Sequence, residues 1–147
     1  MKQVDFYLVT NHVKQARLKM ASRFCNKLQK MQKRILVVSD DPTSSEELRN
    51  VMWSYSDTSF LAHDHISETN TPSSIQLLEA SVFNNALVES EYDVLVSLCD
   101  EVPQFIHHFE RIAEFVAAEE DSKVAGRLRY KKYQSEGFEL KMHNIEL

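Results

Sequence analysis

The chain has 147 residues, 43% of them hydrophobic, which fits one globular domain over residues 1–147 that buries roughly two thirds of its unfolded surface. Acidic residues outnumber basic ones, 22 to 17, and the formal net charge of −5 argues against a dedicated nucleic-acid-binding protein. No apolar run approaches the ~20 residues of a membrane helix, and the N-terminus lacks the apolar core of a secretion signal, so we expect a soluble, cytoplasmic protein.

The first third of the chain is expected to form a strand, a helix, a strand and a helix. Residues 6–9 are a short apolar run typical of a strand, and residues 11–32 carry apolar side chains at intervals of three and four, which predicts an amphipathic helix. Residues 35–38 are apolar on both faces, as in a central strand of a parallel sheet. A capping sequence follows, so a second helix is expected from Pro42 to Trp53.

The middle of the chain is the least regular part. Residues 54–74 are polar apart from residues 59–61, where a short strand is one interpretation. Two further strands are expected at residues 75–78 and 94–98, the second again apolar on both faces. Between them, residues 80–89 fit either an irregular helix or a loop.

The last part is expected to contain two helices and a strand. Residues 105–118 show apolar side chains at helical spacing, and residues 119–122 are expected to end that helix and cap another at residues 123–135. Gly137 would end the second helix, and the alternation in residues 138–142 indicates an edge strand.

These elements together predict an α/β fold. We expect a single-domain, open, mostly parallel sheet flanked by helices, with a topology like that of nucleotide-binding proteins. A phosphate loop needs glycines that bring backbone N–H groups close to the ligand, and this chain has only Gly126 and Gly137, neither of which follows an early strand. The sequence therefore predicts the fold without its phosphate loop and without a nucleotide cofactor.

Metal and redox chemistry are not expected. Histidines cluster at residues 63–65 and 107–108, but no Cys or Glu completes a recognisable ligand spacing, so both clusters are interpreted as structural or surface features. Cys25 falls on the apolar side of an expected helix and Cys99 follows an expected strand. Both are therefore interpreted as reduced core residues.

Two alternative functions stay open on the residues alone. One is a small-molecule enzyme of the α/β class, with a site formed at the strand ends by His12, Asp40 and Asp41. The other is direct DNA binding through the first helix, since residues 10–34 contain basic side chains and no acidic ones. The basic side chains proposed for that contact are Lys14, Arg17, Lys27 and Lys30.

A basic, aromatic helix surface near the C-terminus is the most distinctive feature. Residues 126–133 are rich in Arg, Lys and Tyr in a chain that is acidic overall. Val124 and Leu128 are expected to point toward a core. With no catalytic base or phosphate loop beside it, the surface is expected to bind the carboxylates of a partner. The side chains that share this side at helical spacing are Lys123, Arg127, Tyr130, Lys131 and Gln134.

Several segments, taken in order, are similar to those of one known family. They are Asp5-Phe6-Tyr7-Leu8, Arg34-Ile35-Leu36-Val37-Val38, Trp53 followed by Ser59-Phe60, and Phe115-Val116 leading to Arg127, Arg129-Tyr130-Lys131, Tyr133 and Gly137-Phe138. Over its whole length the chain resembles the chi subunits of bacterial DNA polymerase III. The resemblance implies a non-enzymatic protein that binds the psi subunit of the clamp loader and the acidic C-terminal tail of single-stranded-DNA-binding protein, reaching DNA only indirectly.

The resemblance also implies two separate surfaces. At the tail surface, Val116 and Tyr130 would form a slot, Arg127 or Lys131 would hold the terminal carboxylate, and a basic rim would surround it. That rim would consist of Lys123, Arg129 and Lys132. The psi surface would include Trp53, Phe60 and Leu61, and some members of the family bind a helicase there in place of psi.

Overall fold

The computed structural model describes most of the chain. Expectations for residues 59–61 and 80–89 lie outside the described residues, and so do the side chain of Trp53 and the whole of Phe60 and Leu61. The described residues are 2–54, 64–65, 75–79, 92–104 and 106–147.

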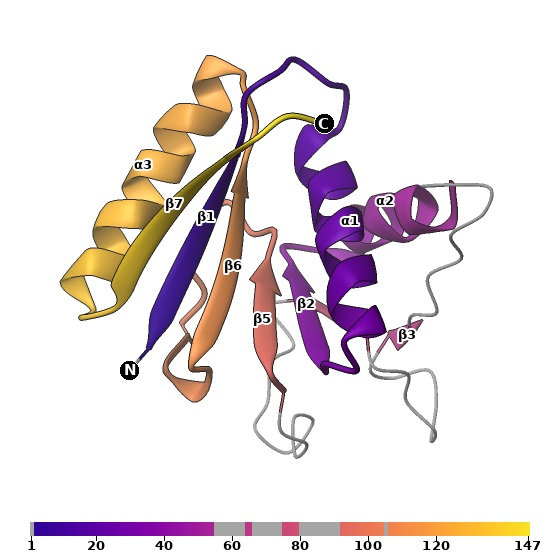
Figure 1. Cartoon of the computed structure of the whole chain (residues 1–147), viewed down its shortest axis with the longest axis horizontal. Coiled ribbons are helices and arrows are strands. Elements are labelled where there is room, and N and C mark those ends of the chain that lie inside the picture. Colours follow the sequence, from indigo (N-terminus) through magenta and orange to yellow (C-terminus); the bar gives the residue numbers. More distant parts are fainter. Residues whose placement is uncertain (1, 55–63, 66–74, 80–91, 105) are drawn as a thin grey trace.

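One parallel sheet forms the centre of the molecule, which confirms the predicted α/β fold (Figure 1). The strand order is β3-β4-β2-β5-β6-β1-β7, and every pairing among the described strands is parallel. The strand β7 is an edge strand, as its alternating sequence indicates. The strands are β1 (Gln3–Val9), β2 (Ile35–Ser39), β3 (Asp64–His65), β4 (Ile75–Glu79), β5 (Val94–Ser97), β6 (Arg111–Val116) and β7 (Glu139–Ile145).

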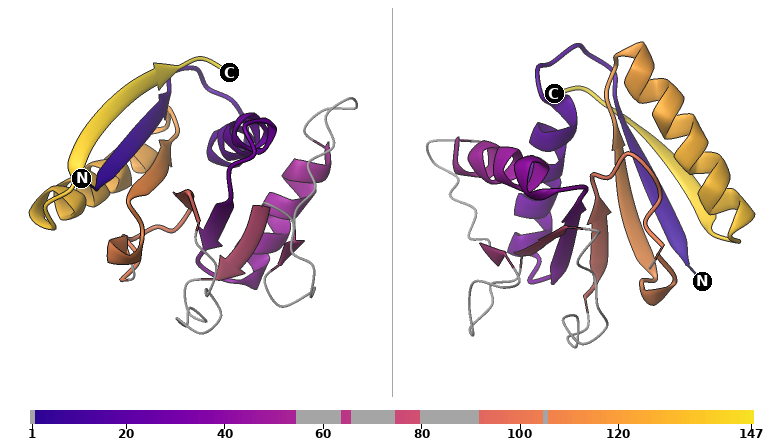
Figure 2. Two further views of the ribbon diagram at one scale, coloured as in Figure 1. Left: turned by 60° about the horizontal axis from the view of Figure 1, so that its bottom comes forward. Right: turned by 180° about the vertical axis from the view of Figure 1, so that it is seen from behind.

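Helices cover both faces of this sheet (Figure 2). The helices α1 (Ala16–Lys30) and α2 (Pro42–Ser54) contribute Met20 and Met52 to one core, while α3 (Glu120–Ser135) contributes Tyr133 to the core on the other face. The fold therefore places α2 and α3 on opposite sides of the sheet.

None of the described helices is long and apolar enough to cross a membrane.

The predicted helix at residues 105–118 is wrong. A 3-10 turn at Ile106–His108 is followed by β6, which pairs with β5 and β1. A strand inside a parallel sheet is apolar on both faces, so its continuous apolar run also contains residues at intervals of three and four. Glu114, the one charged residue between Ile112 and Val116, is completely buried, and local sequence does not identify its partner.

Both cysteines are buried and free, as expected. Burial raises the pKa of the Cys25 thiol to about 12, and burial together with Asp40 and Glu114 raises the pKa of Cys99 to about 12. A thiol with such a pKa is almost entirely protonated at neutral pH and is a poor nucleophile.

Candidate functional site

The helix α3 is fixed at both ends. Glu120 and Asp121 lie in its first turn, where negative charge complements the helix dipole. At the other end Gly137 has a φ of 89°, a left-handed conformation that suits glycine, and its N–H donates to the carbonyl of Gln134. The expected end of the helix at Gly137 is thus confirmed.

The inner side of α3 lies very close to the sheet. A Cβ atom added at Gly126 would lie 2.7 Å from Cγ2 of Val116, so only a glycine allows the helix to approach β6 at this distance. Val116 is 5% exposed and lies beneath this point of the helix. The structure therefore places Val116 under α3, not on an open surface beside it.

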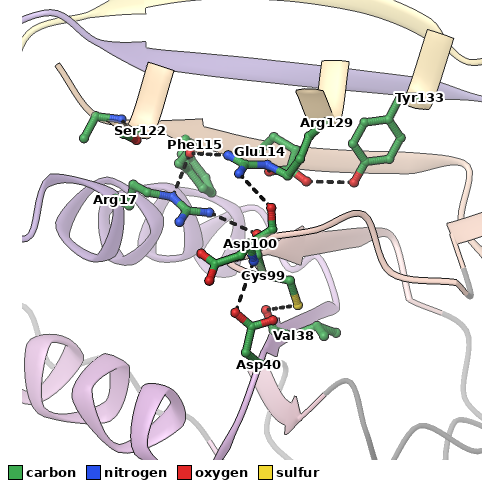
Figure 3. A network of polar contacts seen from close by, with 11 residues as sticks. Arg17, Val38, Asp40, Cys99, Asp100, Glu114, Phe115, Ser122, Arg129 and Tyr133 are labelled. Carbon is green, nitrogen blue, oxygen red and sulfur yellow. Dashed lines mark hydrogen bonds and ion pairs between the residues drawn. The ribbon is translucent and has the colours of Figure 1, made fainter. Parts of the chain in front are cut away.

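A buried polar network joins α3 to the sheet (Figure 3). The Glu114 carboxylate accepts a hydrogen bond of 2.9 Å from Nε of Arg129 and one of 2.7 Å from the hydroxyl of Tyr133. Arg129 also donates to the carbonyl of Asp100 at 3.2 Å. Burial raises the pKa of Glu114, although the charge of Arg129 and the hydrogen bond from Tyr133 oppose that shift. Burial and the Glu114 carboxylate likewise raise the pKa of Tyr133.

The expectation that Arg129 belongs to an exposed basic rim is wrong. Its side chain is 2% exposed because it neutralises Glu114 inside the molecule. An isolated buried carboxylate would cost several kcal/mol, so the pair requires the arginine on the inner side of the helix. Arg129 therefore fixes the position of α3 and is not available to a partner.

The expectation that Val124 and Leu128 face a core is also wrong. They are 46% and 64% exposed, because the inner side of the helix is taken by Gly126, Arg129 and Tyr133. Each exposed apolar residue lies next in sequence to a basic residue of the expected tail surface. The outer side of α3 thus combines apolar and cationic groups.

Most of the residues expected to bind a tail do lie on one side of α3. Arg127 and Lys131 are exposed, and Lys123 is partly exposed. The ring of Tyr130 is partly buried and lies 5.4 Å from the ring of Phe6, which holds it in place. We call the side formed by Lys123, Arg127, Tyr130 and Lys131 the α3 basic surface.

The charges of this surface are only weakly neutralised within the protein. The exposed Arg127 lies 3.8 Å from Glu120, a distance and exposure at which an ion pair contributes little. Lys131 makes no ion pair with any described residue. By contrast, Lys132 is 3.1 Å from Glu136, and the hydrogen bonds from His107 and Lys132 lower the pKa of Glu136. The charges available to an anion are therefore those of Arg127, Lys131 and Lys123.

The residues expected to contact psi are described only in part. Trp53 lies in the last turn of α2, which packs on the sheet face opposite to α3. Phe60 and Leu61 lie outside the described residues. The psi surface thus stays a prediction. The helix α2, whose last turn contains Trp53, lies on the sheet face opposite to α3.

A cavity of about 540 Å³ lies where a nucleotide would bind in a related fold. The helices that follow the neighbouring strands β1 and β6 cross to opposite faces of the sheet, and ligands of open α/β proteins bind at such a point. Arg17 and Arg129 line the cavity, but both guanidinium groups donate to backbone carbonyls. Three carboxylates, those of Asp100, Glu119 and Asp121, also line it and oppose a phosphate, while Lys14 is the one further cation in the lining.

The residues of the alternative enzyme site have structural contacts. Asp41 accepts a hydrogen bond of 2.8 Å from the N–H of Ser44 and caps α2, which lowers the pKa of its carboxyl. Asp40 accepts one of 3.1 Å from the N–H of Asp100, which joins the ends of β2 and β5. His12 is exposed and lies 3.7 Å from Glu119. Each of these three side chains thus has a structural contact within the described part of the chain.

Metal ligands do not cluster in the described part of the chain. No group of three His, Cys, Asp or Glu side chains there could hold an ion. His107 instead lies 2.9 Å from a carboxylate oxygen of Glu136, at the end of α3.

The basic helix α1 has fewer available cations than its sequence suggests. Arg17 donates from Nε to the carbonyl of Phe115 at 2.9 Å and from Nη2 to that of Cys99 at 3.4 Å. Its guanidinium group is therefore already hydrogen-bonded within the protein. Burial and the nearby charge of Arg129 lower the pKa of Arg17. Of the other side chains proposed for the DNA contact, Lys27 and Lys30 on α1 and Lys14 just before it remain exposed.

We expect the isolated protein not to bind single-stranded DNA tightly, even at low salt, because the chain is acidic overall and no aromatic side chain on the outer side of α1 is available to stack on a base. Fluorescence anisotropy with a labelled oligonucleotide measures this. Tight binding with a log–log salt slope of about −2, as expected for three phosphate contacts, would contradict the prediction if reversing Lys14, Lys27 and Lys30 to Glu removed it.

Sequence reasoning missed the Glu114, Arg129 and Tyr133 network. One signal could have indicated it: Glu114 is a lone charge within the run Ile112 to Val116, and a buried acid requires a buried base. The spacing of Gly126, Arg129 and Tyr133 also puts them on one side of α3. A glycine, an arginine and a tyrosine do not, however, form the apolar pattern by which a buried helix side is recognised.

Comparison with known proteins gives a consistent result over nearly the whole chain. The family described as "DNA polymerase III chi subunit, HolC" matches residues 1–141. A protein named DNA polymerase III subunit chi from Pseudomonas aeruginosa is 27% identical over 146 residues, which cover 99% of this chain and 98% of the relative.

Two further relatives carry the same name. The protein from Haemophilus influenzae is 24% identical over 145 residues, covering 98% of both chains. The protein from Escherichia coli is 26% identical over 144 residues, covering 95% of this chain and 96% of the relative.

Proposed function

The chain belongs to the DNA polymerase III chi subunit family of replication accessory subunits, and we propose that it tethers the clamp loader to single-stranded-DNA-binding protein. In this proposal one surface binds the acidic C-terminal tail of that protein and another binds the psi subunit. The protein acts by binding alone and needs no cofactor.

The α3 basic surface carries the proposal for tail binding. Arg127 and Lys131 are exposed beside Tyr130, whose ring is held against Phe6. A tail that ends in an aromatic residue presents a ring, a terminal carboxylate and several further carboxylates. A fixed aromatic side chain flanked by two cations, one of them Arg, matches that set of groups.

The end of α2 is the proposed psi surface. Trp53 and the following Phe60 and Leu61 are large apolar residues, of the kind that dominate binding energy in protein interfaces. The α2 helix lies on the sheet face opposite to α3, so psi and the tail could bind at the same time. A helicase in place of psi at this surface is a second candidate partner.

A synthetic peptide with several aspartates and a C-terminal Pro-Phe tests the tail surface. We expect weak, salt-sensitive binding, because the cations are exposed and their charge is screened by salt. Amidating the terminal carboxylate should weaken binding by about tenfold or more, since a hydrogen bond to a charged group contributes about 1.5 to 3 kcal/mol. Isothermal titration calorimetry measures both affinities.

The amide comparison needs a control for total charge. A peptide with a free terminal carboxylate and one aspartate replaced by asparagine has the same net charge as the amidated peptide. It should bind more tightly than the amide, because it keeps the group that Arg127 or Lys131 holds. Equal affinities of these two peptides would show that binding depends on net charge alone.

A further inference from the structure

An exposed methionine lies on the edge strand next to the α3 basic surface. Met142 in β7 is 55% exposed. Side chains alternate along a strand, and Leu140 packs in the same core as Tyr130 and Tyr133 of α3. Met142 is two residues from Leu140, so it projects from the same face of the sheet, the face that α3 covers.

The register of the sheet connects Met142 to Tyr130. Met142 is the Cα partner of Phe6 in the pairing of β7 with β1. Phe6 is 1% exposed, and the centroid of its ring lies 5.4 Å from that of Tyr130. Phe6 is therefore a common neighbour, with Met142 beside it on the edge strand and Tyr130 beside it on the helix.

We propose that Met142 contacts the terminal aromatic ring of the acidic peptide from the side opposite to Tyr130. This inference rests on the proposed function and adds a residue from a second element to its site. A methionine side chain is flexible and polarisable, adapts to a ring of variable orientation, and makes favourable contacts with an aromatic edge. The occupant is an acidic peptide that ends in an aromatic residue.

Charge favours this occupant over an apolar one. Arg127 and Lys131 lie on the same side of α3 as Tyr130, so a ligand that reaches Met142 passes a doubly cationic region. In the last residue of the peptide, the terminal carboxylate and the aromatic side chain are attached to the same Cα atom, so a carboxylate held by Arg127 or Lys131 keeps the ring close to these cations. The ring of that same residue then meets Tyr130 and Met142.

The other exposed apolar residues of α3 are a weaker site for the ring. Val124 and Leu128 are on the convex outer side of a single helix, where a ring is covered on one side only. Apolar stabilisation grows with the area removed from water, so a contact from two elements buries more of the ring. The edge strand provides that second element.

A double-mutant cycle tests the contact. Met142→Ala is combined with a peptide whose terminal Phe is replaced by Ala, and four affinities are measured by fluorescence anisotropy. We expect Met142→Ala to weaken binding of the Phe-ended peptide by roughly fivefold and of the Ala-ended peptide by less than about twofold. Met142→Leu, which keeps the apolar volume, should retain most of the affinity.

Met31 offers a matched control, since it is also 55% exposed but lies at the end of α1. Met31→Ala should leave both affinities unchanged, and thermal melting should show that both variants are folded. If Leu128→Ala and not Met142→Ala weakens binding of the Phe-ended peptide, or if Met142→Ala acts equally on both peptides, the proposal is overturned while tail binding stands. If the unaltered protein binds neither peptide, the proposed function fails and this inference fails with it.

Discussion

Replacing Arg129 by methionine is expected to lower the free energy of unfolding by about 3 to 5 kcal/mol, because it leaves the Glu114 carboxylate buried without its counter-charge. Glu114 is completely buried and Arg129 is 2% exposed, so solvent screens neither group. Urea unfolding followed by circular dichroism measures the change. A loss below about 1 kcal/mol would show that the buried pair does not hold α3 on the sheet.

A control on the same helix separates this effect from a general loss of charge. Arg127→Met removes an exposed arginine at 3.8 Å from Glu120 and should change stability by no more than about 0.5 kcal/mol. A double variant, Glu114→Leu with Arg129→Met, should recover much of the loss, because it removes the uncompensated charge. The Tyr133 hydroxyl would then lack its acceptor, so recovery should be incomplete.

The stability deficit of Arg129→Met should also depend on pH. Burial already raises the pKa of Glu114, and loss of the arginine removes a charge that opposes that shift. A carboxyl whose pKa is higher in the folded state takes up a proton on folding, so it favours folding at low pH and opposes it as pH rises through that pKa. We therefore expect the deficit to shrink as pH falls from neutral toward the ordinary carboxyl pKa.

The second large effect is the separation of two binding activities. Arg127→Ala or Lys131→Ala should weaken binding of the acidic tail peptide by tenfold to a hundredfold, since each removes a charged hydrogen-bond donor worth about 1.5 to 3 kcal/mol. Psi binding should be unchanged in both variants. Trp53→Ala or Phe60→Ala should have the opposite pattern, because α2 and α3 lie on opposite faces of the sheet and distant sites act independently.

Surface plasmon resonance against tail peptide and purified psi measures both activities on the same samples. Lys30→Ala, an exposed lysine at the end of α1, is the control for loss of one positive charge and should affect neither activity. Loss of both activities in all four variants, with unchanged thermal stability, would refute the assignment of two surfaces.

The secondary structure was predictable where a residue pattern fits only one kind of element. The continuous apolar runs of β2 and β5 indicate central parallel strands, and the glycine at position 137 indicates the end of α3. The strand β6 was not predictable in this way. Its apolar residues fit a helix as well as a strand, and only its pairing with β5 and β1 decides between the two.

The positions of the basic residues on α3 were predictable, but the burial of Arg129 and the exposure of Val124 and Leu128 were not. Helical spacing places Lys123, Arg127 and Lys131 on one side whatever surrounds the helix. Sequence reasoning assigned the apolar Val124 and Leu128 to the core and Arg129 to the surface. The structure reverses both, because the sheet presents the Glu114 carboxylate to α3 and the burial of that charge requires Arg129.

The sequence by itself thus determined the α/β class, the edge position of the last strand, the lack of phosphate-binding glycines and the resemblance to the chi family. Those properties depend on composition and on periodicity within one element. Only the tertiary structure decided which side of α3 faces solvent, that Val116 lies beneath Gly126, and that Met142 lies next to Phe6. Each of these depends on a contact between residues of different helices and strands, and periodicity within one element does not determine such contacts.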